Sequence, residues 1–128
     1  MTIELTMLLY SVFLTFALIL VPATEAILRN GARTQAGARD DLPEAPIYHK
    51  RAKRLVHNML ENMVMFSALV LIAHAAGIST ENTVLGAQIF FYARVFHAIS
   101  YLAGWPWIRP VFWAISLIGM GLIALELF

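Results

Sequence analysis

The chain has 128 residues, of which 60% are hydrophobic and 13% are charged, and its net charge at pH 7 is +1. Soluble domains carry roughly 25% charged residues, so this composition indicates a membrane protein. It also excludes intrinsic disorder, which needs low hydrophobicity and high net charge. The net charge is close to zero, so the composition gives no sign of a basic surface that binds nucleic acid. Because the chain has no cysteine, it has no disulfide framework, no thiolate metal ligand and no cysteine nucleophile of its own.

Four apolar runs, in chain order, are each roughly long enough to cross a bilayer as a helix. They cover residues 5–23, 55–76, 84–103 and 111–128. We expect Pro22 to end the first run, and Gly77 and Gly104 to mark the later breaks. No Lys or Arg precedes the first run, so we expect a retained helix and not a signal peptide. The predicted fold is an all-α integral membrane protein, a single domain over residues 1–128 built as a four-transmembrane-helix bundle.

Lys and Arg are concentrated in the connection between the first two runs. This connection holds seven of the nine basic residues, namely Arg29, Arg33, Arg39, Lys50, Arg51, Lys53 and Arg54. The connection after the second run has none, and Arg109 lies in the one after the third. By the positive-inside rule, the first and third connections face the cytoplasm and both termini lie on the other side of the membrane.

Polar side chains recur inside the second and third runs. A charge at the bilayer centre costs about 2.5–3.5 kcal/mol on insertion scales, so such residues are functional candidates. In the second run they are spaced alternately by three and four residues, which places them on one helical face: Arg51, Arg54, Asn58, Glu61 and Met65. The third run repeats this spacing with Arg94, His97 and Tyr101.

The two polar faces are expected at the same depth. At about 1.5 Å per residue, Glu61 and His97 each lie about 9 Å from the cytoplasmic boundary of their helix, and Arg109 lies just beyond it. Arginine pairs carboxylates bidentately, Glu61 suits an ammonium group and Asn58 suits an amide. We therefore expect an anionic and zwitterionic ligand, with Tyr101 and Arg109 placed to stabilise a developing anion.

Several of these residues, taken singly, also have structural interpretations. Snorkelling to the interface accounts for Arg54, and interhelical hydrogen bonding accounts for Asn58 and Glu61. A structural ion pair would join Arg94 to Glu61. No second histidine accompanies His57 and Glu61 on their face, so we expect no metal site. An interfacial aromatic belt accounts for the tryptophans, Trp105, Trp107 and Trp113.

Two motifs resemble those of one known family. Residues 54–62 (RLVHNMLEN) resemble the R-x-x-x-N-x-x-E-N signature of the MAPEG family, the membrane-associated proteins in eicosanoid and glutathione metabolism. Residues 94–101 (RVFHAISY) are similar to R-V-x-H-x-x-x-Y on the family's third helix, and Arg109 is close to the family's arginine before the fourth helix. Residues 37–43 (GARDDLP) resemble the first loop of bacterial members, which implies a bacterial inner-membrane location.

The resemblance carries expectations about assembly and ligand. It implies a homotrimer of four-helix bundles, with glutathione bound between subunits toward the cytoplasmic side. It implies a set of glutathione-binding residues, some of them in supporting roles: Arg51, Arg54, Asn58, Glu61, Arg94, His97 and Tyr101. It also implies that Arg109, with Tyr101 as the second catalytic candidate, stabilises the glutathione thiolate.

Three classes of function are compatible with these residues. The favoured one is a membrane-bound glutathione transferase or peroxidase, in which the thiolate of the co-substrate glutathione attacks a lipophilic small molecule or lipid. The second is a non-catalytic protein that binds lipid or glutathione, and the third is a structural membrane subunit. Thiolate formation separates the first from the second, and glutathione affinity separates both from the third.

Overall fold

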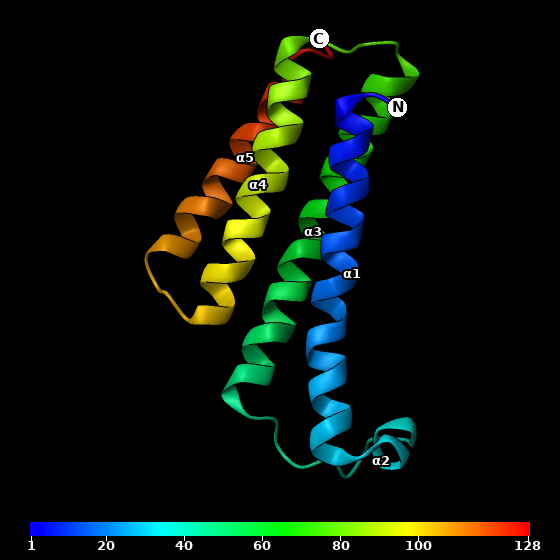
Figure 1. Cartoon of the computed structure of the whole chain (residues 1–128), viewed down its shortest axis with the longest axis vertical. Helices are drawn as coiled ribbons and strands as arrows, with labels where there is room; N and C mark the ends of the chain where they lie inside the picture. Colours follow the sequence, from blue (N-terminus) through cyan, green and yellow to red (C-terminus); the bar gives the residue numbers. More distant parts are fainter.

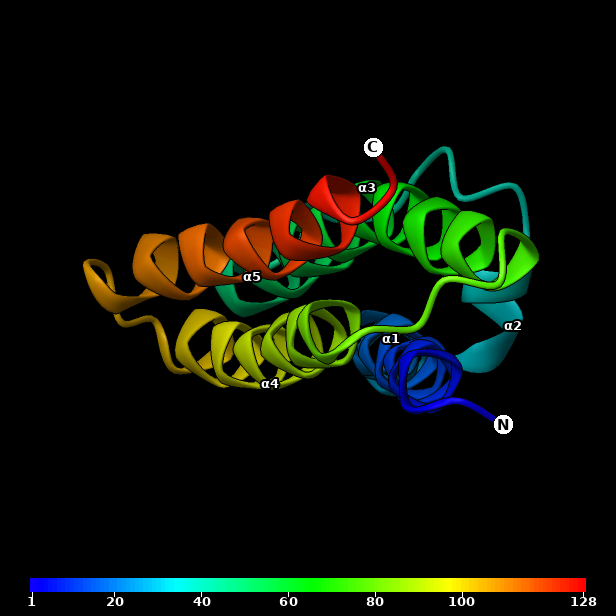
Figure 2. The ribbon, with the colours of Figure 1, turned by 90° about the horizontal axis from the view of Figure 1, so that it is seen from above.

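The computed structural model describes all residues from 1 to 128 and contains five α-helices and no strand. The helices are α1 (Ile3–Asn30), α2 (Ala32–Ala36), α3 (Ile47–Ala75), α4 (Glu81–Ala103) and α5 (Ile108–Leu125). The four long helices run alternately up and down, and the short α2 lies beyond the far end of α1 (Figure 1). Seen from above, α1 and α4 form one row and α3 and α5 the other (Figure 2).

Three of the long helices, α1, α3 and α5, are long and apolar enough to cross a membrane. Helix α4 has 23 residues but is not among them, and it carries Arg94, His97 and Gln88. Many large apolar side chains point outward, for example Phe13, which is 61% exposed. Such a surface suits lipid and not water.

Two helix boundaries differ from those expected from hydropathy. Helix α1 does not end at Pro22, which is buried inside the helix; it continues to Asn30 and is closed by Gly31 at φ 85°. Helix α3 begins at Ile47, well before the apolar run. Its first two turns therefore contain four of the basic residues, namely Lys50, Arg51, Lys53 and Arg54. The two lengths differ for a physical reason. An apolar run marks only the part of a helix that lies in lipid, whereas the helix itself continues into water as long as its backbone hydrogen bonds persist.

The start of α5 also differs from the expected one, and it changes where Arg109 lies. Arg109 does not lie in the α4–α5 connection, because α5 already begins at Ile108 with Trp107 as its N-cap residue. Pro110 fits this first turn, since the first backbone N–H groups of a helix have no intrahelical partner. Arg109 is therefore held on a helix and not on a loop.

The core consists of two clusters at different heights of the bundle. The larger one joins all four long helices and includes Phe66 and Phe90, whose rings stack with centroids 3.8 Å apart. The smaller one, nearer the α2 end, joins α1, α3 and α4 through Leu18, Leu55, Met59 and Ala98. These clusters set the rotation of α3 and α4 about their axes, and thereby decide which polar side chains face each other.

Candidate functional site

A cavity of about 330 Å³ opens between α3, α4 and α5, beside the α4–α5 connection. It lies at the end of α4 remote from both chain termini (Figure 1). Its lining comprises Asn58, His97, Tyr101, Pro106, Arg109, Pro110 and Trp113. Four of these, from three helices, were predicted as site residues: Asn58, His97, Tyr101 and Arg109.

Arg94 lies directly behind this cavity and is bound to one of its lining residues. Its side chain is buried, and Nη2 donates a 2.6 Å hydrogen bond to Asn58 Oδ1. Nε and Nη1 of the same guanidinium have no hydrogen-bond partner. A buried donor without a partner raises the free energy by about 1–3 kcal/mol, so an acceptor that reaches these nitrogens is bound favourably.

The side chains of His97, Tyr101 and Arg109 follow one another along the cavity. His97 is buried with Nδ1 unpaired, and its ring centroid lies 5.6 Å from that of Tyr101. The guanidinium carbon of Arg109 lies 4.7 Å from the centroid of the Tyr101 ring. This cation–π contact positions the arginine by the ring face. None of the four ion pairs in the chain includes Arg109, so its charge is available to an anion.

Arg54 and Glu61 lie outside this cavity and are exposed in the single chain. Glu61 Oε1 pairs with His57 Nε2 at 3.0 Å, and the Glu61 side chain is 62% exposed. The structural ion pair between Arg94 and Glu61, one of the alternatives that the sequence leaves open, is not formed in this chain: Arg94 binds Asn58 instead. The polar stripe of α3 borders the buried face of the helix, and of its members Asn58 and Arg51 contact α4 or its C-cap, whereas Arg54 and Glu61 do not.

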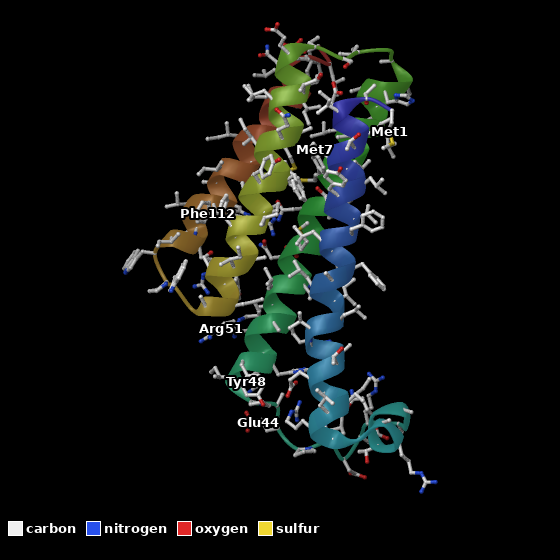
Figure 3. All side chains as sticks on the ribbon, in the orientation of Figure 1. Met1, Met7, Glu44, Tyr48, Arg51 and Phe112 are labelled. Atoms are coloured by element: carbon white, nitrogen blue, oxygen red, sulfur yellow. The ribbon has the colours of Figure 1, made fainter.

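Arg51 occupies a neighbouring position at the end of α4. A Cβ atom added to Gly104 would lie 3.1 Å from Arg51 Nη1, so the guanidinium packs directly against this glycine. Gly104 has φ 77° and ends α4. A cation at the C-terminal end of a helix is stabilised by the helix dipole. Figure 3 shows Arg51 at the lower end of α4, where it fastens α3 to α4 next to the cavity.

Three lining residues were not predicted as site residues: Pro106, Pro110 and Trp113. The sequence placed Trp113 in an interfacial aromatic belt. A signal was present nevertheless, because Trp113 follows Arg109 by four residues and so shares its helical face. Pro106, in the α4–α5 connection, and Pro110, in the first turn of α5, add apolar surface to the cavity wall.

The model of the MAPEG family matches residues 7–128. The chain belongs to the MAPEG family. This confirms the resemblance seen in the two motifs. Together with the three apolar helices, it makes the chain an integral membrane protein of a family associated with glutathione and eicosanoid metabolism. Comparisons with curated proteins and with solved structures found no match.

Within this single MAPEG chain, the motif residues divide into two groups. Asn58, His97 and Tyr101 face the cavity, with Arg94 bound to Asn58. Arg54 and Glu61, from the same motif as Asn58, point away from it. The cavity lining contains no carboxylate, and Arg109 is its one full positive charge. Chemically, such a site suits an anion.

Proposed function

We propose that this MAPEG protein is a membrane-bound glutathione transferase with glutathione peroxidase capacity. The observation that carries the proposal is the placement of Arg109: its guanidinium lies over the Tyr101 ring, outside any ion pair, at a cavity without a carboxylate. The buried donors of Arg94 behind Asn58 add to the attraction for a carboxylate of glutathione. Asn58 and His97 supply polar atoms that can form hydrogen bonds with the peptide groups of glutathione.

The proposed chemistry is the stabilisation of the glutathione thiolate. A free thiol has a pKa of about 8.5, and lowering it to about 6.5 requires about 2.7 kcal/mol of preferential binding of the anion. A charge-assisted hydrogen bond from Arg109 is of this size once a neighbouring subunit shields the site from water. The thiol proton leaves to solvent, and the sulfur then forms a bond to an electrophilic carbon while the leaving group departs with its electron pair. With a hydroperoxide, the sulfur forms a bond to the terminal oxygen while the O–O bond breaks, which gives glutathione sulfenic acid and an alkoxide that takes a proton from solvent to become an alcohol. A second glutathione then reduces the sulfenic acid, and the products are glutathione disulfide and water.

The exposed polar face of α3 supports an assembly of several subunits. Arg54, His57 and Glu61 are exposed on a helix that is apolar enough to cross a membrane. Leaving charges in contact with lipid is costly, so a neighbouring subunit must cover them. We infer a homotrimer in which this face completes the glutathione site, with Glu61 available to the ligand's ammonium group.

The positions of the termini support four membrane crossings. Both chain ends lie at the same end of the bundle (Figure 1), which requires an even number of crossings. Helix α4 supplies the fourth, with Arg94 and His97 buried between the helices. The basic residues at the start of α3 lie at the opposite end, where Figure 3 labels Tyr48 and Arg51. By the positive-inside rule, we infer that this end is cytoplasmic and that both termini lie outside. The proposed bacterial inner-membrane location rests on the resemblance of residues 37–43 to the first loop of bacterial members.

Glutathione titration of the detergent-solubilised protein, read by thiolate absorbance in the ultraviolet, tests the proposal. We expect a saturable thiolate band at pH 7 and turnover of an aryl halide or a lipid hydroperoxide. Saturable binding without a thiolate band would contradict the enzyme and identify a glutathione-binding protein. Absence of any binding would contradict both and leave a structural or lipid-binding role.

A further inference from the structure

A second polar site lies at the other end of the bundle, near the chain termini. Glu4, in the first turn of α1, is only 4% exposed. Its Oε1 accepts hydrogen bonds from Thr83 Oγ1 at 2.5 Å and from Ser79 Oγ at 2.8 Å. Its Oε2 is buried and has no partner, and no ion pair in the chain includes Glu4. Oε1 therefore joins α1 to the start of α4 through its hydrogen bonds, whereas Oε2 forms no hydrogen bond between helices.

Glu4 also lines a cavity of about 190 Å³ between α1, the end of α3 and the α3–α4 connection. The polar part of the lining comes from Thr2, Glu4, His74 and Ser79, and the apolar part from Val70, Ala73 and Ile78. His74, Gly77 and Ser79 are exposed, so the cavity is reached from the surface. A water molecule takes about 30 Å³ of liquid, so the space holds about six non-hydrogen atoms.

The chemistry of the lining selects the kind of ligand. A buried carboxylate without a cation is unfavourable, so the unpaired Oε2 favours a positive charge. Calcium and magnesium need about six or more oxygen ligands, and this lining has a single acidic side chain. An ammonium group needs fewer acceptors, and its carbon chain is suited to the apolar wall of Val70, Ala73 and Ile78.

We propose that this cavity binds a primary ammonium group on a short carbon chain, with the carboxylate of Glu4 as its counter-ion. Thr2 and Ser79 supply further oxygen atoms at the cavity wall. Glu4 lies in the first turn of a membrane-spanning helix, which is the depth of lipid headgroups. The amine is therefore either the ethanolamine headgroup of a phospholipid or a free amine from the compartment outside. The proposal is independent of the glutathione site, which lies at the opposite end of α4.

Thermal unfolding of the detergent-solubilised full chain provides the first test, with ethanolamine and choline compared at equal ionic strength. Ethanolamine should raise the unfolding midpoint, and choline, whose quaternary nitrogen has no N–H to donate, should not. In Glu4→Gln the side-chain shape is kept but the charge is lost. Its apparent affinity for ethanolamine should fall at least about tenfold, because removing one partner of a buried pair is strongly unfavourable. Glu81→Gln is the matched control, since Glu81 is exposed at the same end and does not line the cavity.

The second test separates the two sources of the amine. The protein is reconstituted with equal amounts of phosphatidylethanolamine and phosphatidylcholine, and retained lipid is counted by native mass spectrometry. Preferential retention of phosphatidylethanolamine by the wild type and by Glu81→Gln, but not by Glu4→Gln, identifies the lipid headgroup. Stabilisation by free ethanolamine without lipid preference identifies a soluble amine.

Two outcomes would overturn the proposal. One is an equal effect of ethanolamine and choline on the wild type together with no lipid preference. The other is a wild-type response in Glu4→Gln. If Glu4→Gln does not fold, the ethanolamine and choline comparison and the lipid preference of the wild type decide the question alone.

Discussion

The buried guanidinium of Arg94 is held by the neutral side chain of Asn58, with 2.6 Å between Arg94 Nη2 and Asn58 Oδ1. No carboxylate compensates this charge within the chain, because none of the four ion pairs includes Arg94. The hydrogen bond joins α3 to α4 beside the cavity, so the uncompensated charge of Arg94 lies next to Asn58 in the cavity wall. This relationship yields a test in which stability and ligand binding change in opposite directions.

Asn58→Asp should stabilise the protein and weaken glutathione binding. The new carboxylate keeps the hydrogen bond to Arg94 and neutralises its charge, so the unfolding midpoint without ligand should rise. The same negative charge repels the carboxylates of glutathione, so the dissociation constant should rise. Asn58→Ala, the control, should lower both stability, by about 1–3 kcal/mol, and affinity, because it leaves the Arg94 donor unpaired. An Asp variant with unchanged glutathione affinity would show that Arg94 takes no part in binding.

Arg109→Ala should mainly lower turnover. If Arg109 stabilises the thiolate, its contribution belongs to the reacting form of glutathione, and loss of one such donor lowers kcat about 10²–10³-fold. The rate should recover between pH 6 and 9, because a rising pH deprotonates the thiol without help from the guanidinium. Arg54→Ala, which removes a charge outside the cavity, should instead raise KM. A full rate in Arg109→Ala at pH 6.5 would reassign thiolate stabilisation, with Tyr101 as the next candidate.

Glu61→Gln should change the assembled protein more than the single chain. Glu61 lies inside an apolar run of the sequence, but its side chain is 62% exposed in the single chain and pairs with His57. Exposed pairs contribute little to stability, so the unfolding midpoint of the dissociated single chain in detergent should change little. The glutathione dissociation constant should rise at least about tenfold, and the trimer seen by native mass spectrometry should weaken, because charges at intramembrane contacts are costly to leave unpaired. A stable wild-type monomer that binds glutathione fully would refute the shared site.

Gly86→Ala should disrupt the packing of α4 on α5. A Cβ atom at Gly86 would lie 2.5 Å from the backbone oxygen of Gly119, and one at Gly119 would lie 2.6 Å from the backbone oxygen of Gly86. Because both obstacles are backbone, the helices must separate, at a typical cost of about 1–3 kcal/mol. Gly121→Ala is the matched control: its Cβ meets nothing within 4 Å, so its stability should be unchanged or slightly higher. Equal unfolding midpoints for the two variants would contradict this close approach.

The sequence by itself determined the class of the protein and the family. Apolar runs of sufficient length predicted the four long helices, since a helix is the one way for a single segment to satisfy its backbone groups in lipid. Two motifs with exact spacing identified the MAPEG family, which the family match confirms. The spacing also placed Arg94, His97 and Tyr101 on one face of a helix. Apolar runs and residue spacings carry local information. The hydropathy of a segment and the helical face of a residue both depend only on residues that are near each other in the sequence.

The tertiary structure alone decided how each helix is rotated about its axis. The polar stripe of α3 was predicted as one unit, yet Asn58 turns to Arg94 while Glu61 turns outward to His57. That division follows from the packing of Leu55 and Met59 into the core, which involves side chains of other helices. The bond between Glu4 and Thr83, 79 residues apart, is of the same kind. Such pairings depend on contacts between helices distant in sequence, and no local pattern along one segment encodes them.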